Sequence, residues 1–331
     1  MSMTEFAAPI LSIIVPVKDE EEAIPDFVRR VSKVIEALPD PAAQSYEILF
    51  IDDGSSDHSM AAIAAAHLAN RNVRAISLSR NFGKEAALSA GLDHARGAAI
   101  VPMDVDLQDP PEVLAEMVAK WRAGFDMVYG VRKDRATDSL AKRWTADLYY
   151  KAHNLLSSDR IPDHAGDFRL LDRRVVDVLR VLPERNRFMK GLFAWSGFKS
   201  TSVEYVRAER MLGTTKFRAW KLWTLALDGI TSSSTLPLRI WTYVGGIVAI
   251  LSFLYALFII TKALFFGIAV PGYASIMVAV LFLGGLQLLS LGILGEYVGR
   301  IMIETKQRPL YIVRDSIGLS DDERADSPGK N

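Results

Sequence analysis

Three oxygen-bearing side chains follow an apolar run near the middle of the chain. Asp104, Asp106 and Gln108 stand at alternate positions directly after the run 98–103, and two prolines close the stretch. The pattern predicts a buried strand that delivers the three side chains to the edge of a sheet, with a helix beginning at the prolines. Carboxylate and amide oxygens suit a hard divalent cation such as Mg²⁺ or Mn²⁺. We therefore expect a metal site here, the alternative being a solvated acidic loop.

Polar clusters of the same kind follow two earlier apolar runs. The run 11–17 leads into Lys18 and Glu20, and the run 46–51 leads into Asp52 and Asp53. Predicted strands and helices alternate with short loops, which is typical of an α/β domain whose mostly parallel sheet is covered on both faces. Ligands bind at the carboxyl ends of the strands in such a sheet. These polar residues should therefore meet at one edge.

The remaining elements extend this pattern. Helices are predicted over residues 20–38, 60–68, 84–94 and 111–121, and strands over 73–78, 98–103 and 126–130. Further along, helices are predicted over 139–156, 175–182 and 187–195, and strands over 168–171 and 199–206. The polar segment after Arg314 is predicted to be disordered.

The composition excludes several kinds of site. The chain has 331 residues, no cysteine and a formal net charge of zero. Without cysteine there is no disulfide framework, thiolate nucleophile or cysteine-based zinc site. The balanced charge indicates no nucleic-acid partner. The dinucleotide fingerprint, the P-loop and the Gly-x-Ser-x-Gly nucleophile elbow do not occur, which disfavours the enzymes that depend on them.

Two long uncharged segments lie toward the C-terminus. Residues 240–261 carry no charge, and a second apolar segment, 273–295, follows a Pro-Gly turn. About 20 apolar residues span the hydrocarbon core of a bilayer, so we expect a two-helix transmembrane hairpin. Six Lys or Arg residues precede it at 207–239 and four follow it at 300–314, whereas the loop between the spans has Lys262 alone. The positive-inside rule then places both termini in the cytoplasm.

A basic, tryptophan-bearing segment at 217–230 precedes the first span and predicts a helix lying in the membrane interface. The expected organisation is a cytoplasmic catalytic domain at 1–215 and a juxtamembrane interfacial helix at 216–239. The hairpin follows at 240–295, and a cytoplasmic tail completes the chain at 296–331.

The ordered motifs of the chain resemble family 2 glycosyltransferases, and the resemblance covers residues 10–220 and continues into the hairpin. The motifs are Val15–Glu20, Asp52–Asp57, Ser79–Glu85, Asp104-x-Asp106-x-Gln108, Gly130–Arg132, Gly166–Leu170 and Arg210–Phe217. The resemblance implies the GT-A fold, with a doubly wound, mostly parallel sheet. It is strongest to the group that transfers a sugar to a polyprenyl phosphate, which includes dolichol-phosphate mannose synthase and the bacterial undecaprenyl-phosphate glucosyltransferases.

The resemblance also implies a role for each matching position. Asp104, Asp106 and Arg132 would be catalytic, and Asp104, Asp106 and Gln108 would hold Mg²⁺ or Mn²⁺. Asp167 and Arg169 are expected to form a structural pair at the floor of the cleft. Nucleotide-sugar binding is assigned to Pro16, Lys18, Glu20, Ile51, Asp52, Asp53, Lys84, Asp104, Val105, Asp106, Arg132, Arg210 and Lys216. The candidates for binding the lipid phosphate are Arg132, Arg143, Lys151, Arg185, Arg187 and Lys190.

The implied reaction is an inverting, metal-dependent transfer of glucose from UDP-glucose to undecaprenyl phosphate. It would take place at the cytoplasmic face of the inner membrane, in a multi-pass protein that forms a dimer or tetramer. The donor stays open, since UDP-N-acetylglucosamine, an aminoarabinose donor or GDP-mannose would suit the same architecture. A processive polysaccharide synthase is a weaker alternative, because Leu140 departs from the Gln-x-x-Arg-Trp motif and two spans are few for a channel. A non-catalytic membrane scaffold is the alternative from another class.

Overall fold

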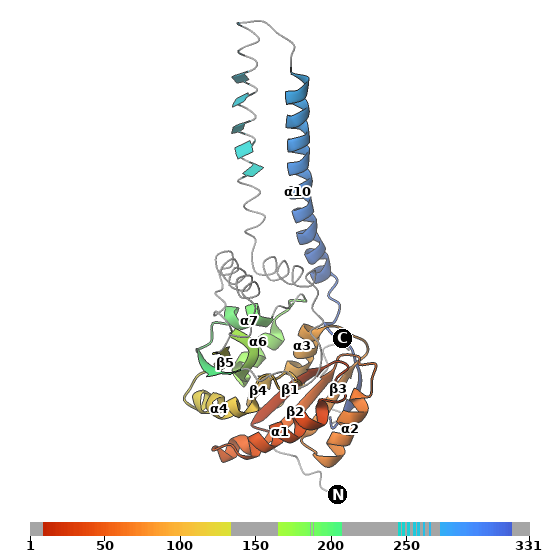
Figure 1. Cartoon of the computed structure of the whole chain (residues 1–331), viewed down its shortest axis with the longest axis vertical. Coiled ribbons are helices and arrows are strands. Elements are labelled where there is room, and N and C mark those ends of the chain that lie inside the picture. Colours follow the sequence, from red (N-terminus) through yellow and green to blue (C-terminus); the bar gives the residue numbers. More distant parts are fainter. Residues whose placement is uncertain are drawn as a thin grey trace.

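Eight strands form one mixed sheet in the order β7-β5-β6-β4-β1-β2-β3-β8 (Figure 1). The computed structural model describes residues 9–133, 165–185, 187, 189–206, scattered positions between 244 and 265, and 272–319. Parallel pairing joins β1 to β2 and β4, β2 to β3, and β5 to β7, whereas β6 and β8 pair antiparallel with their neighbours. The predicted α/β class with a mostly parallel sheet is confirmed. The strands are β1 (Leu11–Val17), β2 (Tyr46–Asp52), β3 (Val73–Leu78), β4 (Ala99–Pro102), β5 (Met127–Arg132), β6 (Ala165–Asp172), β7 (Ser200–Tyr205) and β8 (Val313–Ile317).

Helices cover both faces of the sheet, which explains why its central strands are apolar throughout. In β1, Ile13 and Val15 join the core on one face and Ile14 joins the core on the other. The first face is covered by α1 (Ile24–Glu36), α2 (Ser59–Ala69) and α4 (Leu114–Arg122), with the short turns η1 (Pro41–Gln44) and η2 (Pro111–Val113). The second face is covered by α3 (Lys84–His94), α6 (Arg173–Val181) and α7 (Met189–Trp195).

The first helix is shorter than predicted. It was expected from residue 20, but α1 begins at Ile24 and buries Phe27, Val31 and Ile35 along one face. The acidic stretch before it stays in a loop, because Asp19, Glu20 and Glu21 make hydrogen bonds with the loop that follows β2.

The strand order reverses beside β1. The chain runs from β1 through β2 to β3 on one side and then returns to β4 on the other side of β1. Loops leaving β1 and β4 at their carboxyl ends therefore diverge, and a crevice opens between them. This is the place where a ligand is expected in such a sheet.

A buried charge network lies at the opposite, amino-terminal edge. Glu47 of β2 is 1% exposed, and its carboxylate accepts hydrogen bonds from Ser12 of β1 at 2.5 Å and from Arg74 of β3 at 2.6 Å. The backbone N–H and the Nε of Arg96 donate to the same carboxylate at 2.7 and 3.1 Å. Each of the three strands contributes its second residue, so the network joins their starting ends.

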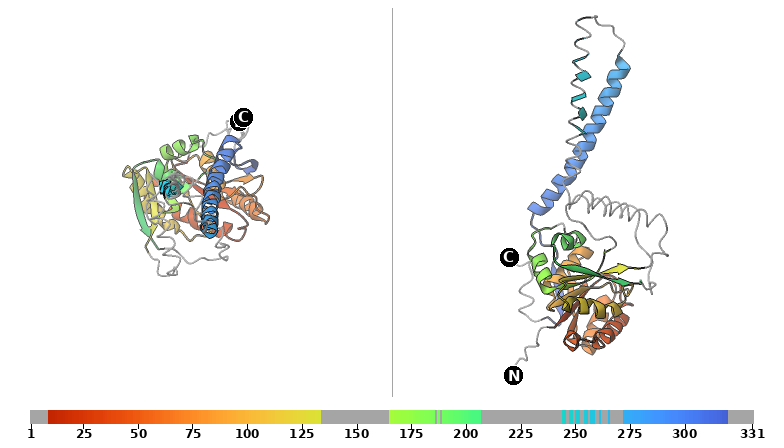
Figure 2. Two further views of the ribbon diagram at one scale, coloured as in Figure 1. Left: turned by 90° about the horizontal axis from the view of Figure 1, so that it is seen from above. Right: turned by 90° about the vertical axis from the view of Figure 1, so that its left-hand side faces the viewer.

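A long helix, α10 (Tyr273–Thr305), stands away from the sheet domain (Figures 1 and 2). Within the described part of the chain, its segment Phe282–Thr305 is the one helix long and apolar enough to cross a membrane. The helix contains the whole predicted span 273–295 and continues beyond it to Thr305. The helix continues through three charged residues spaced four apart, Glu296, Arg300 and Glu304, which therefore lie on one face.

Half of the first predicted span, 240–261, falls outside the described residues. The positions described between 244 and 265 are helical. The two-helix hairpin therefore stays a prediction, as do the predicted helix 139–156 and the interfacial helix at 216–239, which lie outside the described residues.

The prediction of disorder after Arg314 is wrong for residues 315–319. There the chain forms β8, which pairs antiparallel with β3 at the sheet edge. The guanidinium of Arg314 donates to Ser77 at 2.9 Å, and Arg74 donates to the Gly318 carbonyl at 3.0 Å. A short strand that carries charged residues suits a sheet edge, where one side meets solvent. The strand could not be predicted from local hydrophobicity, because its conformation depends on pairing with β3.

Candidate functional site

A cavity of about 420 Å³ opens at the carboxyl ends of β1 and β4, where the strand order reverses. It thus lies where the fold predicts a ligand site. The ends of β1 and β2, the loop before α3, and the turn after β4 all contribute to its wall. The lining residues are Pro16, Val17, Lys18, Glu20, Asp53, Asn81, Gly83, Lys84, Ala87, Asp104, Val105 and Asp106.

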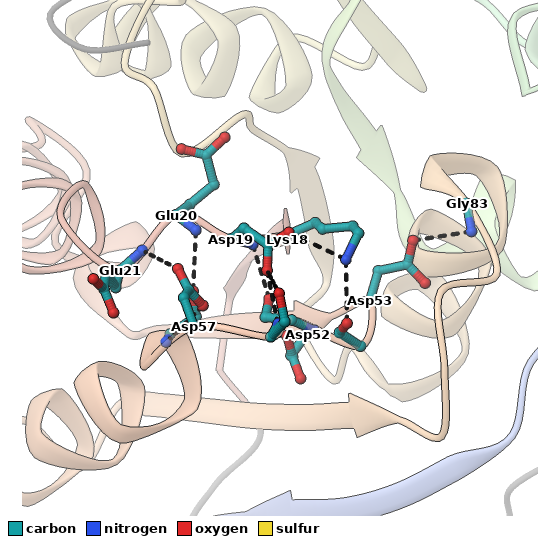
Figure 3. Close-up of polar contacts among 12 residues, drawn as sticks. Lys18, Asp19, Glu20, Glu21, Asp52, Asp53, Asp57 and Gly83 are labelled. Atoms are coloured by element: carbon teal, nitrogen blue, oxygen red, sulfur yellow. Dashed lines mark hydrogen bonds and ion pairs between the residues drawn. The ribbon is translucent and has the colours of Figure 1, made fainter. Parts of the chain in front are cut away.

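The loop after β1 is bound along its length to the loop after β2 (Figure 3). The N–H groups of Asp19 and Glu20 donate to the hydroxyls of Ser55 and Ser59 at 2.9 and 3.0 Å. In return, the N–H of Ser56 donates to the Asp19 carboxylate at 2.7 Å, and this bond is the main cause that lowers the pKa of Asp19. Asp19 has a φ of 54°, a left-handed conformation that is uncommon outside glycine and that these bonds hold in place.

Two adjacent aspartates after β2 have different surroundings. Asp52 is fully buried, and its carboxylate accepts hydrogen bonds from the Ser55 N–H at 2.9 Å and from the Ser77 hydroxyl at 2.8 Å. Asp53 lines the cavity and accepts from the N–H groups of Phe82 and Gly83 at 2.7 and 2.9 Å. Burial raises the pKa of Asp53, and these two bonds partly offset that rise. Of the two candidates for binding the base, the structure thus places Asp53 on the cavity.

A glycine brings these loops together. Gly54 has a φ of +66°, and a Cβ at this position would lie 2.6 Å from the backbone carbon of Arg80. The turn after β2 and the loop after β3 therefore approach each other as closely as backbone allows. The ammonium of Lys18 donates to the Gly54 carbonyl at 3.2 Å, which positions its charge at the cavity wall.

The turn after β4 separates the three predicted metal ligands. Asp104 and Asp106 line the cavity. Leu107 is buried in the core with a φ of 52°, a conformation that is rare for a branched side chain and redirects the chain after Asp106. Gln108 is 7% exposed and is not among the residues that line the cavity, and its backbone N–H donates to the Asp106 carboxylate at 3.2 Å.

The donor set at the cavity suits a divalent cation shared with a phosphate ligand. In the part of the chain that the structure describes, no group of three or more His, Cys, Asp or Glu side chains is placed to hold a metal ion. Two carboxylates do share the cavity wall, and the Lys84 ammonium contacts both oxygens of Asp104 at 2.7 and 3.0 Å. A divalent cation at Asp104 and Asp106 would need oxygen donors from a ligand to complete its coordination.

A charge cluster extends from the cavity toward α7. Asp167 of β6 lies 3.3 Å from the ammonium of Lys84 and 3.6 Å from that of Lys190. Although burial opposes it, Lys190 and Lys84 lower the pKa of Asp167 to about 2. Burial and the nearby Asp167 raise the pKa of Glu85 to about 7. Arg169, which was expected to pair with Asp167, also lowers the pKa of that carboxyl, and its guanidinium lies 4.0 Å from the ring centre of Phe193.

Other predicted site residues lie away from the cavity lining. Ile51 is fully buried in the core beneath α3. Arg132 ends β5, and its Nε donates to the Tyr205 hydroxyl at 3.4 Å. That hydroxyl donates in turn to Asp109 at 2.5 Å. Arg132 is thus positioned by Tyr205 of β7, which Asp109 holds from the segment after β4.

The candidates for binding the lipid phosphate near α7 also make contacts away from the cavity lining. Arg187 donates from its guanidinium to the carbonyls of Leu182 and Glu184, so it supports the loop before α7. The backbone N–H of Arg185 donates to the Glu304 carboxylate of α10 at 2.9 and 3.0 Å. Arg143, Lys151, Arg210 and Lys216 lie outside the described residues.

Sequence reasoning missed part of the cavity wall. Val17, Asn81, Gly83 and Ala87 line it but were not named individually. A usable signal existed for Asn81 and Gly83, since both stand in the polar segment that follows β3. Glu85 belongs to the motif Ser79–Glu85, but its contact with α7, where its carboxylate accepts from the Met189 N–H at 3.3 Å, could not be read from the sequence.

Family models and related proteins both indicate a glycosyltransferase. Residues 12–180 match the domain family described as glycosyl transferase family 2, and residues 236–301 match the family described as GtrB C-terminal hairpin. The SfII prophage-derived bactoprenol glucosyl transferase of Shigella flexneri is 53% identical over 306 residues, 92% of this chain and 98% of that protein. An uncharacterized glycosyltransferase of Synechocystis sp. is 50% identical over 309 residues, 93% of this chain and 96% of that protein.

Likeness to solved structures is more distant. A structure of glucosyl-3-phosphoglycerate synthase from Mycobacterium tuberculosis, in complex with Mn²⁺, UDP-glucose and phosphoglyceric acid, aligns at 19% identity with a TM-score of 0.45. The alignment covers 67% of this chain and 77% of that one, and it is too weak to support a conclusion about the site.

Proposed function

The chain belongs to glycosyltransferase family 2, and from that premise we propose that it transfers a sugar from a nucleoside diphosphate donor to a polyprenyl phosphate at a membrane surface. It is a glycosyltransferase, which sets aside the non-catalytic scaffold. Relatives named bactoprenol glucosyl transferases align with it over 92% of its length, including the segment that matches a C-terminal hairpin. Bactoprenol is a polyprenyl lipid, so these names support the acceptor class.

One observation carries the proposal for the donor. Asp53, Lys84, Asp104 and Asp106 meet on a single cavity at the reversal of strand order. Each Asp53 oxygen accepts one backbone bond and keeps a second lone pair, which can accept a hydrogen bond from the imide N–H of a base. Lys18 and Lys84 bring positive charge to the wall between this end and Asp104. The cavity therefore suits a ligand with a polar base at one end and a diphosphate at the other.

The chemistry follows from the charges of the two substrates. A lipid phosphate is already anionic near neutral pH, so it needs positioning rather than a strong general base. The leaving nucleoside diphosphate gains charge, which cationic side chains such as Lys84 stabilise in the transition state. Mg²⁺ or Mn²⁺ held by Asp104 and Asp106 would add Lewis-acid stabilisation of the same group. We expect in-line attack by the lipid phosphate oxygen at the sugar C1, with inversion.

The acceptor is expected to approach from the foot of α10. Glu304, near the end of that helix, accepts hydrogen bonds from the Arg185 backbone. Lys190, shortly after Arg185, reaches Asp167 in the charge cluster beside the cavity. Arg185 thus contacts the proposed membrane helix, and Lys190 contacts the charge cluster beside the donor cavity. We propose that the enzyme works at the cytoplasmic face of the inner membrane as a multi-pass homo-oligomer, with UDP-glucose and undecaprenyl phosphate as the first substrates to test.

The test is transfer by the purified full-length chain in lipid nanodiscs. Undecaprenyl phosphate and Mg²⁺ or Mn²⁺ are supplied with UDP-glucose, UDP-N-acetylglucosamine, GDP-mannose or an aminoarabinose donor, and the lipid product is analysed by mass spectrometry. Asp104→Asn and Asp106→Asn should abolish product formation, whereas Asp177→Asn, at a half-exposed carboxylate on α6, should not. Product with retained anomeric configuration would contradict a single displacement. Activity that survives both cavity substitutions and chelation would contradict the metal-dependent site.

A further inference from the structure

The ammonium of Lys84 occupies the position at Asp104 that a divalent cation would need. It contacts both oxygens of that carboxylate, at 2.7 and 3.0 Å. The side chains of Lys84 and Asp104 are each 44% exposed, so the pair lies at the open cavity rather than in the core. An ammonium and a divalent cation repel each other, so a cation bound to these carboxylate oxygens weakens their contact with the ammonium.

A second carboxylate is within reach of the same ammonium. Asp167 lies 3.3 Å from the Lys84 Nζ, on the side of the cluster that leads to Lys190. Lysine carries a compact charge on a flexible four-carbon stem, so a small rotation of the side chain changes its main partner. Lys84 can therefore leave Asp104 without losing an anionic partner and without moving α3, of which it is the first residue.

We infer that Lys84 is the internal counter-ion of the donor site: it pairs with both Asp104 and Asp167 while the site is empty, and with Asp167 alone when a divalent cation binds. This inference rests on the proposed function, because it assumes a cation at Asp104 and Asp106. It assigns Lys84 a role beyond contact with the donor. A free divalent cation must compete with the Lys84 ammonium for Asp104. When the cation arrives with a diphosphate, the negative charge of the diphosphate attracts both the cation and the ammonium.

The consequence is that donor and cation bind together rather than separately. Competition from Lys84 lowers the affinity for the cation alone. The same ammonium attracts the diphosphate, so it raises the affinity for the pair. Coupling of this kind is reciprocal: the nucleotide strengthens cation binding by the same factor as the cation strengthens nucleotide binding.

The experiment measures Mn²⁺ binding by electron paramagnetic resonance to the full-length protein in nanodiscs, with and without UDP. Lys84→Met keeps the length of the side chain and removes the charge. It should bind Mn²⁺ alone about three- to fivefold more tightly than the unmodified protein, as expected for loss of a partly exposed ion pair. The factor by which UDP strengthens Mn²⁺ binding should fall. Lys120→Met is the matched control, since Lys120 forms a partly exposed ion pair with Glu116 on α4 and does not line the cavity, and the substitution should change Mn²⁺ affinity by less than about twofold.

A second variant tests the alternative partner. Asp167→Asn removes the carboxylate that receives Lys84, so it should weaken Mn²⁺ binding in the unmodified background. It should have a smaller effect when combined with Lys84→Met, and the double-mutant cycle measures that difference. Mn²⁺ affinity that is unchanged or weakened in Lys84→Met, or additive effects of the two substitutions, would overturn the inference. If no variant binds Mn²⁺ even with UDP present, the proposed metal-dependent function itself fails.

Discussion

The buried network around Glu47 supports a quantitative prediction about stability. Glu47→Gln keeps the shape of the side chain but removes the charge that compensates Arg74. Both partners are nearly inaccessible, with side chains 2% and 3% exposed, and their atoms lie 2.6 Å apart. The buried guanidinium of Arg74 would then lose the negative charge of Glu47, and the amide would present an N–H group toward donors. No compensating contact is gained.

The expected cost can be estimated from burial. Removing one partner of a buried ion pair costs about 3–5 kcal/mol, whereas an exposed pair contributes about 0–1 kcal/mol. For a domain of about 200 residues, each kcal/mol shifts the melting temperature by about 2–4 °C. We therefore expect Glu47→Gln to lower the apparent Tm by on the order of 10 °C. Glu112→Gln is the control, because Glu112 forms an ion pair with Arg30 in which the side chains are 56% and 37% exposed.

The assay is thermal unfolding of the full-length protein in detergent, followed by tryptophan fluorescence, together with the donor KM of the folded protein. Glu47 lies at the amino-terminal edge of the sheet and the donor cavity at the carboxyl edge, so the KM should stay within about twofold while the Tm falls. A Tm within about 2 °C of the unmodified protein would refute the reasoning from burial. A KM that changes while the Tm does not would show that the network acts on the site instead.

Three further predictions concern the site and its surroundings. Asp106→Asn should reduce kcat/KM for sugar transfer by at least about 100-fold, since it removes a carboxylate at the reacting diphosphate, and a loss below about tenfold in a product assay would contradict that role. Tyr205→Phe should cost about 1–3 kcal/mol of stability, measured by chemical unfolding, because it deprives Asp109 of a donor at 2.5 Å. Since the folded pKa of Glu85 is raised to about 7 from a usual 4.5, the folded state binds the extra proton between these values, and stability should fall as pH rises through that window. Glu85→Gln should flatten the dependence of Tm on pH between about 4.5 and 7, and an unaltered slope would exclude Glu85 as its source.

The first half of the fold could be predicted because its strands and helices depend on local pattern. The bounds predicted for β1, β3 and α3 agree with the structure, since uniformly apolar runs and helical spacing determine them. β8 was missed because Val313–Ile317 is polar, and its strand conformation depends on hydrogen bonds to β3. The predicted span 273–295 is shorter than α10 because hydropathy marks the apolar part of a helix and not where the helix ends.

The candidate site was predictable where it depends on strand ends. Lys18, Asp53, Asp104 and Asp106 each follow a strand of the parallel core, and the structure brings them to one cavity. Gln108 was not predictable to the same degree, because the left-handed Leu107 that redirects the chain leaves no mark in the spacing of polar residues. The contact of Lys84 with Asp167 depends on the insertion of β6 beside β4, which local sequence does not report.

The last strand has a consequence for biosynthesis. Ser77, which holds the Asp52 carboxylate beneath the donor loops, receives its second hydrogen bond from a residue made 237 positions later. A nascent chain folds from its N-terminus. The edge of β3 that pairs with β8 therefore stays unpaired until α10 and β8 have left the ribosome. Completion of the sheet and delivery to the bilayer therefore belong to the same late stage of synthesis. We expect the donor pocket to reach full order only in chains whose α10 has already been made, which would keep the enzyme inactive until the helix proposed to enter the bilayer is present.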